Sequence, residues 1–468
     1  MRVNAISRRG FLAGMAALSV AGWRRVAVAA GYPAYWGESL ARAVARVSEL
    51  AKTCSDGFWF ITDLHCRHNA CQSGLLLSEL VRRSPLTNVI CGGDLPVAFA
   101  DGFACDREAV DFAIDTYCDK WVKPIRANGG KVYTAKGNHD FAVRHSIRPT
   151  EDRRAGFTYD GKKAHEVIMA GCTERDVVTN AADPAACYYY FDNATAKIRY
   201  IVADSCDSEK AGDVSWGVIQ GMHETQLAWL AGEAFATTPD GYSVVVVHHI
   251  PVSAALDKRY APLYDLLKAY QNRGVYKVGK RKFGFKEARG RIILDLTGHK
   301  HCNMATFEHG VLQVTTASDG YVNDKRAEWW SGQTASKKVG TATEQAFDAI
   351  QLDPVRRLVH CTHVGGGGQD RMYHLDATTV EVGQKRSFAT SLRGPIAWLC
   401  HDANRVENVK STTKRFLVVA KPRNDFATIN AEGVLTATAP GEIMVIARCA
   451  NGTVEAFPVT VVSRKDPA

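Results

Sequence analysis

The chain has 468 residues, 46% of them apolar and 23% charged, which is typical of globular proteins. This composition excludes a disordered chain, a coiled coil and a collagen-like rod, and the length predicts at least two domains. The net charge is +9, but residues 1–30 hold five arginines and no acid, so the remainder carries only +4. That charge does not favour nucleic-acid binding, and no apolar run approaches the about 20 residues of a transmembrane segment.

Residues 1–30 have the order of an export signal. Arg8 and Arg9 precede the uncharged apolar stretch 11–21, and small residues follow at 27–30. This order resembles a twin-arginine signal peptide with its cleavage site. We therefore expect export, and a periplasmic or extracellular mature protein. The alternative is an amphipathic first helix of the folded domain.

The thirteen cysteines all follow this segment and form no C-x-x-C pair, which argues against a zinc finger. Because their number is odd, at least one is free or pairs between chains. Cys54, Cys66, Cys71 and Cys105 are close enough in sequence to bridge one another, but the sequence does not give the connectivity. We expect most of the others to be buried as small apolar residues.

Short apolar runs alternate with amphipathic helical patterns from residue 58 to about 362, which predicts an α/β domain. Helical spacing recurs in 110–121 and 227–234, and residues 188–202 read as a hairpin. The expected buried strands are Phe58–Ile61, Asn88–Cys91, Val132–Ala135, Tyr242–Val247 and Ile292–Leu296.

The character of the chain changes after the glycine run 365–368, and short alternating strands follow. Residues 427–437 and 441–447 resemble the bacterial immunoglobulin-like domain of group 2. The resemblance implies an all-β Ig-like sandwich over residues 380–464, with Trp398 in its core. Such a module would bind cell-wall or surface glycan.

Polar clusters directly follow the five expected strands. They are Asp63-Leu64-His65, Gly92-Gly93-Asp94, Gly137-Asn138-His139-Asp140, His248-His249-Ile250-Pro251 and Gly298-His299-Lys300-His301. Each cluster alone is weak evidence for a site. Because open α/β sheets gather their functional groups at the carboxyl ends of strands, together they predict one shared site.

The side chains of these clusters suit metal binding. Carboxylate, imidazole and amide groups favour Mn²⁺, Fe or Zn²⁺, whereas oxygen ligands alone would favour Ca²⁺ or Mg²⁺. Seven candidate ligands are too many for one catalytic ion with an open position. They fit two divalent ions about 3.5–4 Å apart, an arrangement used for phosphoryl displacement.

The order D-x-H, G-D, G-N-H-[DE], H, G-H-x-H is similar to that of the calcineurin-like metallophosphoesterase superfamily. The resemblance covers about Phe58 to Arg371, and residues 345–348 and 368–371 resemble an exported branch. It implies a phosphoesterase domain over residues 31–375, built as a four-layer αββα sandwich of two mixed sheets. It also implies hydrolysis of phosphomonoesters or phosphodiesters by metal-hydroxide attack on phosphorus.

The resemblance assigns roles by motif position. The first ion would be held by Asp63, His65 and His301, and the second by Asn138, His249 and His299, with Asp94 bridging them. His139 would stabilise the transition state or protonate the leaving oxygen, and Asp140 would orient its ring. Neighbouring strand residues point to opposite faces, so only one of His248 and His249 is expected to bind. The family spacing H-x-P favours His249.

Two other functions stay open. One is a cell-surface binding protein that uses the Ig-like module and keeps only a vestigial enzyme. The other is a metal-dependent nuclease, which the basic stretch 277–291 favours and the small mature charge disfavours.

Overall fold

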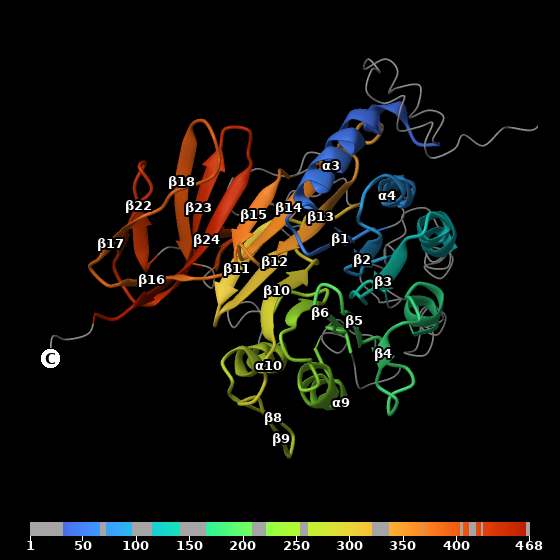
Figure 1. The fold of residues 1–468 in the computed structure, drawn as a ribbon, viewed down its shortest axis with the longest axis horizontal. Coiled ribbons are helices and arrows are strands. Elements are labelled where there is room, and N and C mark those ends of the chain that lie inside the picture. Colours follow the sequence, from blue (N-terminus) through green and yellow to red (C-terminus); the bar gives the residue numbers. More distant parts are fainter. Residues whose placement is uncertain are drawn as a thin grey trace, which may run out of the picture.

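The computed structural model describes residues 31–65, 72–95, 115–140, 165–207, 221–252, 261–320, 337–366, 368–402, 406–410, 418–422 and 425–464. Two large mixed sheets hold most of the strands in this part of the chain (Figure 1). The helices are η2 (Ala34–Trp36), α3 (Gly37–Leu50), α4 (Gln72–Arg83), η3 (Thr116–Val122), α6 (Lys123–Ala127), η5 (Glu166–Gly171), α9 (Glu224–Trp229), η6 (Leu230–Phe235) and α10 (Ala261–Gln271).

The first sheet has the order β18-β23-β24-β15-β14-β13-β1-β2-β3, with β16 also paired to β24. Its strands are β1 (Asp56–Ile61), β2 (Asn88–Cys91), β3 (Lys131–Thr134), β13 (Ala346–Asp353), β14 (Leu358–Gly365), β15 (Arg371–His374), β16 (Thr378–Glu381), β18 (Ile396–Asp402), β23 (Gly441–Cys449) and β24 (Val454–Val462). β1, β2 and β3 are parallel, so their carboxyl ends share one edge. α3 packs on β13 and β14 and buries Leu40, Ala43 and Val47, which recur at helical spacing.

The second sheet has the order β11-β12-β10-β7-β6-β5-β4. Its strands are β4 (Val178–Thr179), β5 (Tyr189–Asn193), β6 (Ile198–Val202), β7 (Ser243–Val247), β10 (Arg291–Thr297), β11 (Met304–Glu308) and β12 (Val311–Thr315). β6, β7, β10 and β12 are parallel, and most of their residues are buried because both faces of the sheet are covered. α3 and α4 lie on one side of the two sheets, and α9 and α10 on the other (Figure 1).

The C-terminal strands extend the first sheet. β24 pairs in parallel with both β15 and β16, so hydrogen bonding continues across the expected boundary at 375–380. A second apolar core, separate from the main one, includes Leu435, Ile443, Val445 and Val459. The remaining strands are β8 (Val275–Val278), β9 (Arg281–Gly284), β17 (Lys385–Ser387), β19 (Val406–Lys410), β20 (Val418–Pro422), β21 (Ala427–Ile429) and β22 (Val434–Ala437).

The structure confirms an α/β fold with mixed sheets, and each expected buried strand is present with its limits shifted by at most two residues. The Ig-like assignment of residues 380–464 stays a prediction. The expected signal at 1–30 lies outside the described residues, as do Cys66, Cys71 and Cys105. Among the residues that are described, no helix is both long and apolar enough to cross a membrane.

Candidate metal centre

The five polar clusters meet where the carboxyl ends of β1, β2, β3, β7 and β10 come together. Ligand atoms of one group lie within 4.8 Å of one another, and so do those of a second group that shares Asp94. The first group is Asp63, His65, Asp94 and His301, and the second is Asp94, His249 and His299. Asn138 joins the second group, since its Oδ1 lies 2.8 Å from His299 Nδ1. The structure thus brings together all seven residues expected to bind metal.

Asp63 is fully buried and organises the first group. Its Oδ2 accepts hydrogen bonds from Thr62 Oγ1 at 2.8 Å and from the His299 backbone N–H at 2.9 Å. Its Oδ1 faces the imidazoles, 2.9 Å from His301 Nε2 and 3.9 Å from His65 Nε2. Burial alone would raise the pKa of Asp63, but the histidines, led by His301, outweigh it and hold the pKa well below its usual range.

The two imidazoles of the first group face each other. His65 Nε2 lies 3.2 Å from His301 Nε2, and both rings are buried. Burial, together with the neighbouring imidazoles His139 and His301, lowers the pKa of His65 and so favours the neutral ring. Neutral imidazole is the form that binds metal ions.

Asp94 lies between the two groups. Its Oδ1 accepts a hydrogen bond from the His139 backbone N–H at 2.7 Å, and its Oδ2 lies 3.0 Å from His249 Nε2. His249 Nδ1 donates to the Gly92 carbonyl at 2.8 Å, which directs Nε2 toward the carboxylates. Burial opposes charge on His249, but Asp94 and Asp63 outweigh it and raise its pKa to about 9. A cation bound here would take the place of that proton.

Backbone strain is concentrated at this centre. Nine non-glycine residues in the described part of the chain have positive φ, and five of them are candidate ligands. These five are Asp63, His65, Asp94, His299 and His301, with φ between 43° and 66°. Left-handed conformations are costly for such side chains and persist at functional sites where the surrounding structure enforces them.

Gly298 allows the β10 loop to approach the β1 loop. A Cβ atom at this position would clash with Thr62 Oγ1 and would lie 2.6 Å from Asp63 Oδ2. A side chain here would therefore displace the carboxylate of Asp63 or the loop that carries His299. The glycine is required by the close contact between the loops.

The carboxylate of Asp140 accepts hydrogen bonds from two loops of the centre. Its Oδ2 accepts from the backbone N–H groups of Gly137 at 2.7 Å and Asp94 at 3.0 Å, and its Oδ1 accepts from Leu95 at 2.7 Å. The carboxylate thus ties the loop after β2 to the loop after β3. That Asp140 also orients the His139 ring stays a prediction. Burial and the nearby Asp94 raise the pKa of Asp140 to about 7.

His139 stands beside the first group. Its ring packs edge-on against His65, with centroids 5.0 Å apart, and its Nε2 lies 3.9 Å from Asp94 Oδ2. The side chain keeps 16% of its surface exposed, against 10% for His301 and 0% for His249. The ring can therefore contact a molecule that enters from solvent.

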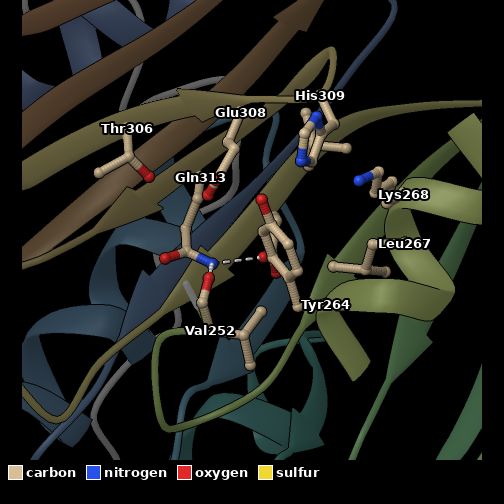
Figure 2. Close-up of a pocket in the computed structure, with 10 residues that line it drawn as sticks. Val252, Tyr264, Leu267, Lys268, Thr306, Glu308, His309 and Gln313 are labelled. Carbon is tan, nitrogen blue, oxygen red and sulfur yellow. Dashed lines mark hydrogen bonds between the residues drawn. The ribbon is translucent and has the colours of Figure 1, made fainter. Parts of the chain in front are cut away.

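The structure separates His248 from His249. His248 points away from the centre, with Nδ1 donating to the Ile250 carbonyl and Nε2 2.8 Å from Asp295 Oδ1. Gln313 donates to Asp295 Oδ2 at 2.6 Å and to the Val252 carbonyl at 3.1 Å. Figure 2 shows this amide on the wall of a small pocket. His248 therefore belongs to a buried support behind the centre.

A buried ion pair lies next to the loop that carries Asn138, and no sequence pattern predicted it. Lys136 precedes the Gly137-Asn138 loop, and its ammonium group contacts the carboxylate of Asp204. Asp204 in turn accepts from the Cys206 backbone N–H at 2.9 Å. The pair anchors the loop that carries Asn138. Only the position of Lys136 next to the motif could have suggested it.

The residues fit divalent cations. Asp63 Oδ1, Asp94 Oδ2 and His249 Nε2 are buried without an aligned hydrogen bond among the described residues. Buried imidazole nitrogens and two carboxylates that face one another cost free energy unless a bound group satisfies them. A cation between them would do so. The donor set suits Mn²⁺, Fe or Zn²⁺ and does not distinguish among them.

No protein family model matches the chain, and no curated protein does. Among solved structures, GAP50, the anchor in the inner membrane complex of Plasmodium, is similar at 11% identity and a TM-score of 0.35, over 67% of this chain and 85% of that one. A predicted phosphoesterase from Streptococcus pneumoniae TIGR4 is similar at 13% identity and a TM-score of 0.22, over 68% and 95%. The phosphopantetheinyl hydrolase of Mycobacterium tuberculosis is similar at 15% and 0.25, over 57% and 91%. These similarities are too low to assign a function to this chain.

Proposed function

We propose that the chain is a metal-dependent phosphoric ester hydrolase with a dinuclear centre. The observation that carries this proposal is the pair of ligand groups that share the Asp94 carboxylate. A shared carboxylate between two sets of imidazole and oxygen ligands is the arrangement expected for two cations acting on one phosphate. Both phosphomonoesters and phosphodiesters remain candidate substrates.

Different residues of the chain would bind the cations, donate a proton and position the loops. Asp63, His65 and His301 would hold one cation, and Asn138, His249 and His299 the other, with Asp94 contacting both. Bound cations would supply Lewis acidity, neutralising phosphate oxygens and activating water. His139, whose ring centroid lies 5.0 Å from that of His65 and whose side chain is partly exposed, would donate a proton to the leaving oxygen. Asp140 would hold the two loops in register through its three backbone hydrogen bonds.

We further propose export through the segment 1–30 and an Ig-like module over 380–464 that binds cell-wall or surface glycan. The paired arginines support the first proposal, and the separate C-terminal apolar core supports the second. Because β24 is hydrogen-bonded to β15, the module would be held firmly against the enzyme. Pull-down of the full chain on purified cell wall tests the second proposal, and retention equal to that of an unrelated protein would contradict it.

The activity is tested with the full chain loaded with Mn²⁺, using bis-p-nitrophenyl phosphate and p-nitrophenyl phosphate. We expect hydrolysis of at least one ester, lost on chelation and restored by Mn²⁺. Asp94→Asn should lower kcat/KM about 10²-fold or more, because it weakens the shared ligand. Turnover of the diester alone would direct a substrate search to lipid, nucleotide or polymer diesters.

Asp376→Asn is the matched control, because it also removes a carboxylate. Asp376 is 55% exposed and pairs with Arg291 and Arg357 at the surface. Its activity should equal that of the wild type. Equal activity in Asp94→Asn, or no hydrolysis of either ester by protein that holds two Mn²⁺ ions, would contradict the proposal.

A further inference from the structure

We infer that a second metal site, suited to Zn²⁺, lies at the opposite end of β1 and is formed by Cys54, Asp353 and His360. One ligand atom from each residue lies within 4.8 Å of those of the other two. Tetrahedral zinc sites combine the same thiolate, imidazole and carboxylate donors. In the described part of the chain, the candidate dinuclear centre uses no cysteine, so the two sites differ in chemistry.

The fold brings the three residues together from separate elements. Cys54 follows the last turn of α3, where its N–H donates to the Leu50 carbonyl at 2.9 Å. Asp353 ends β13, and His360 lies on β14 opposite Gln351. Because residues two apart on a strand share a face, Asp353, Gln351 and His360 all lie on one face of the sheet. Gln351 donates to the Val47 carbonyl of α3, which identifies that face as the one beneath α3 (Figure 1).

The buried imidazole of His360 is the feature that points to a bound ligand. It is 6% exposed, and its Nε2 is buried with no hydrogen-bond partner among the described residues. A polar atom buried in this way costs free energy unless something binds it. Burial, with Arg46 nearby, lowers the pKa of His360 to about 4, so the ring is in the neutral form that coordinates a metal.

Asp353 is available to a cation as well. It is 1% exposed, and its Oδ2 lies 2.7 Å from Arg356 Nε. The Arg356 side chain is 54% exposed, so it can move into solvent at little cost when a metal takes its place. Burial and Asp353 raise the pKa of the Cys54 thiol to about 11. Binding of Zn²⁺ would therefore release one thiol proton to solvent, leaving a thiolate and a carboxylate to balance the two charges of the ion.

The site would be structural and independent of catalysis. β1 separates Cys54 from Asp63, and its six residues span about 20 Å at 3.3 Å per residue. A metal at Cys54 would cross-link the segment after α3 to both strands of the β13–β14 hairpin. Its fourth position would be filled by water, since three protein ligands are present.

Cobalt substitution of the full chain tests the site. Co²⁺ bound to a thiolate has a charge-transfer band in the near ultraviolet, and none of the seven residues assigned to the candidate dinuclear centre is a cysteine. We expect this band in the wild type, its loss in Cys54→Ala, and one zinc ion fewer per chain in that variant. Cys449→Ala is the matched control, since Cys449 is partly exposed and its Sγ donates to the Arg393 carbonyl at 3.4 Å, away from the three proposed ligands.

Two further variants distinguish loss of this site from misfolding and from loss of the dinuclear centre. His360→Gln retains the sulfur and should weaken zinc retention against a chelator at least tenfold, even where Cys54→Ala fails to fold. Asp63→Asn disrupts the other centre and should leave the cobalt–thiolate band intact, so failure of the proposed function would not be mistaken for failure of this site. A wild type without the band, or an unchanged band in Cys54→Ala, would overturn the inference.

Discussion

Replacing Asp348 by asparagine tests whether a buried ion pair on β13, the strand beside β1, supports the fold. Asp348 lies on β13 and is 1% exposed. Its Oδ2 lies 2.7 Å from a terminal guanidinium nitrogen of Arg371, and its Oδ1 lies 3.0 Å from His363 Nδ1. Arg371 is also buried, so the pair is shielded from solvent on both sides.

The expected loss of unfolding free energy is about 3–5 kcal/mol, because Asp348→Asn leaves the Arg371 guanidinium buried without a counter-charge. Asp376→Asn provides the comparison, since it removes a carboxylate from an ion pair at the surface. Exposed pairs contribute about 0–1 kcal/mol. The two substitutions are chemically identical, so their difference isolates the effect of burial.

The pH dependence follows from the same contacts. Burial would raise the pKa of Asp348, but Arg371 and His363 outweigh it and lower the pKa below 3.8. The contribution is therefore complete above the unfolded pKa and is lost as the pH falls through the folded value. We expect the stability of the wild type to fall below about pH 4 more steeply than that of Asp348→Asn.

Urea unfolding of the full chain, followed by circular dichroism and tryptophan fluorescence, measures both variants. Coincident transitions for the two probes would justify a single free energy. A loss below about 1 kcal/mol in Asp348→Asn, equal to that in Asp376→Asn, would refute the reasoning about the buried pair.

Two further predictions concern the centre and a thiol pair. Gly298→Ala should lower phosphoesterase kcat/KM about 10²-fold by displacing Asp63, whereas Gly284→Ala, whose added Cβ meets nothing within 4 Å, should leave it unchanged; equal rates would contradict the clash. Cys172 lies 3.0 Å from Cys118 and lowers the pKa of the Cys118 thiol by hydrogen bonding. Cys172→Ala should therefore raise that pKa and slow alkylation of Cys118 near neutral pH, as measured by mass spectrometry; an unchanged rate would exclude the hydrogen bond.

The sequence predicted the strands and the place of the site because apolar runs and polar clusters are adjacent in the chain. Asp63 and His65 closely follow β1, and Asn138 follows β3. The order of residues along the chain was therefore enough to predict where these side chains lie. The alternation of side chains also predicted that one of His248 and His249 would face away. Which one it is depends on Asp295, supplied by the neighbouring strand β10.

Other features arise from contacts between distant parts of the chain. The ion pair of Lys136 and Asp204 joins residues far apart in sequence, and no local sequence pattern predicts it. The loop-tying role of Asp140 depends on where the backbone of Asp94 comes to lie. The continuity of the first sheet into the C-terminal strands likewise requires β24 to return to β15 after some eighty residues.

The most direct test of the central claim is low-temperature electron paramagnetic resonance of the full chain titrated with Mn²⁺. If Asp94 holds two cations together, two equivalents of Mn²⁺ should give the spectrum of a spin-coupled pair, and Asp94→Asn should give isolated ions or lose one of them. A wild-type spectrum of isolated Mn²⁺ at every ratio, or binding of a single ion, would contradict the shared dinuclear centre.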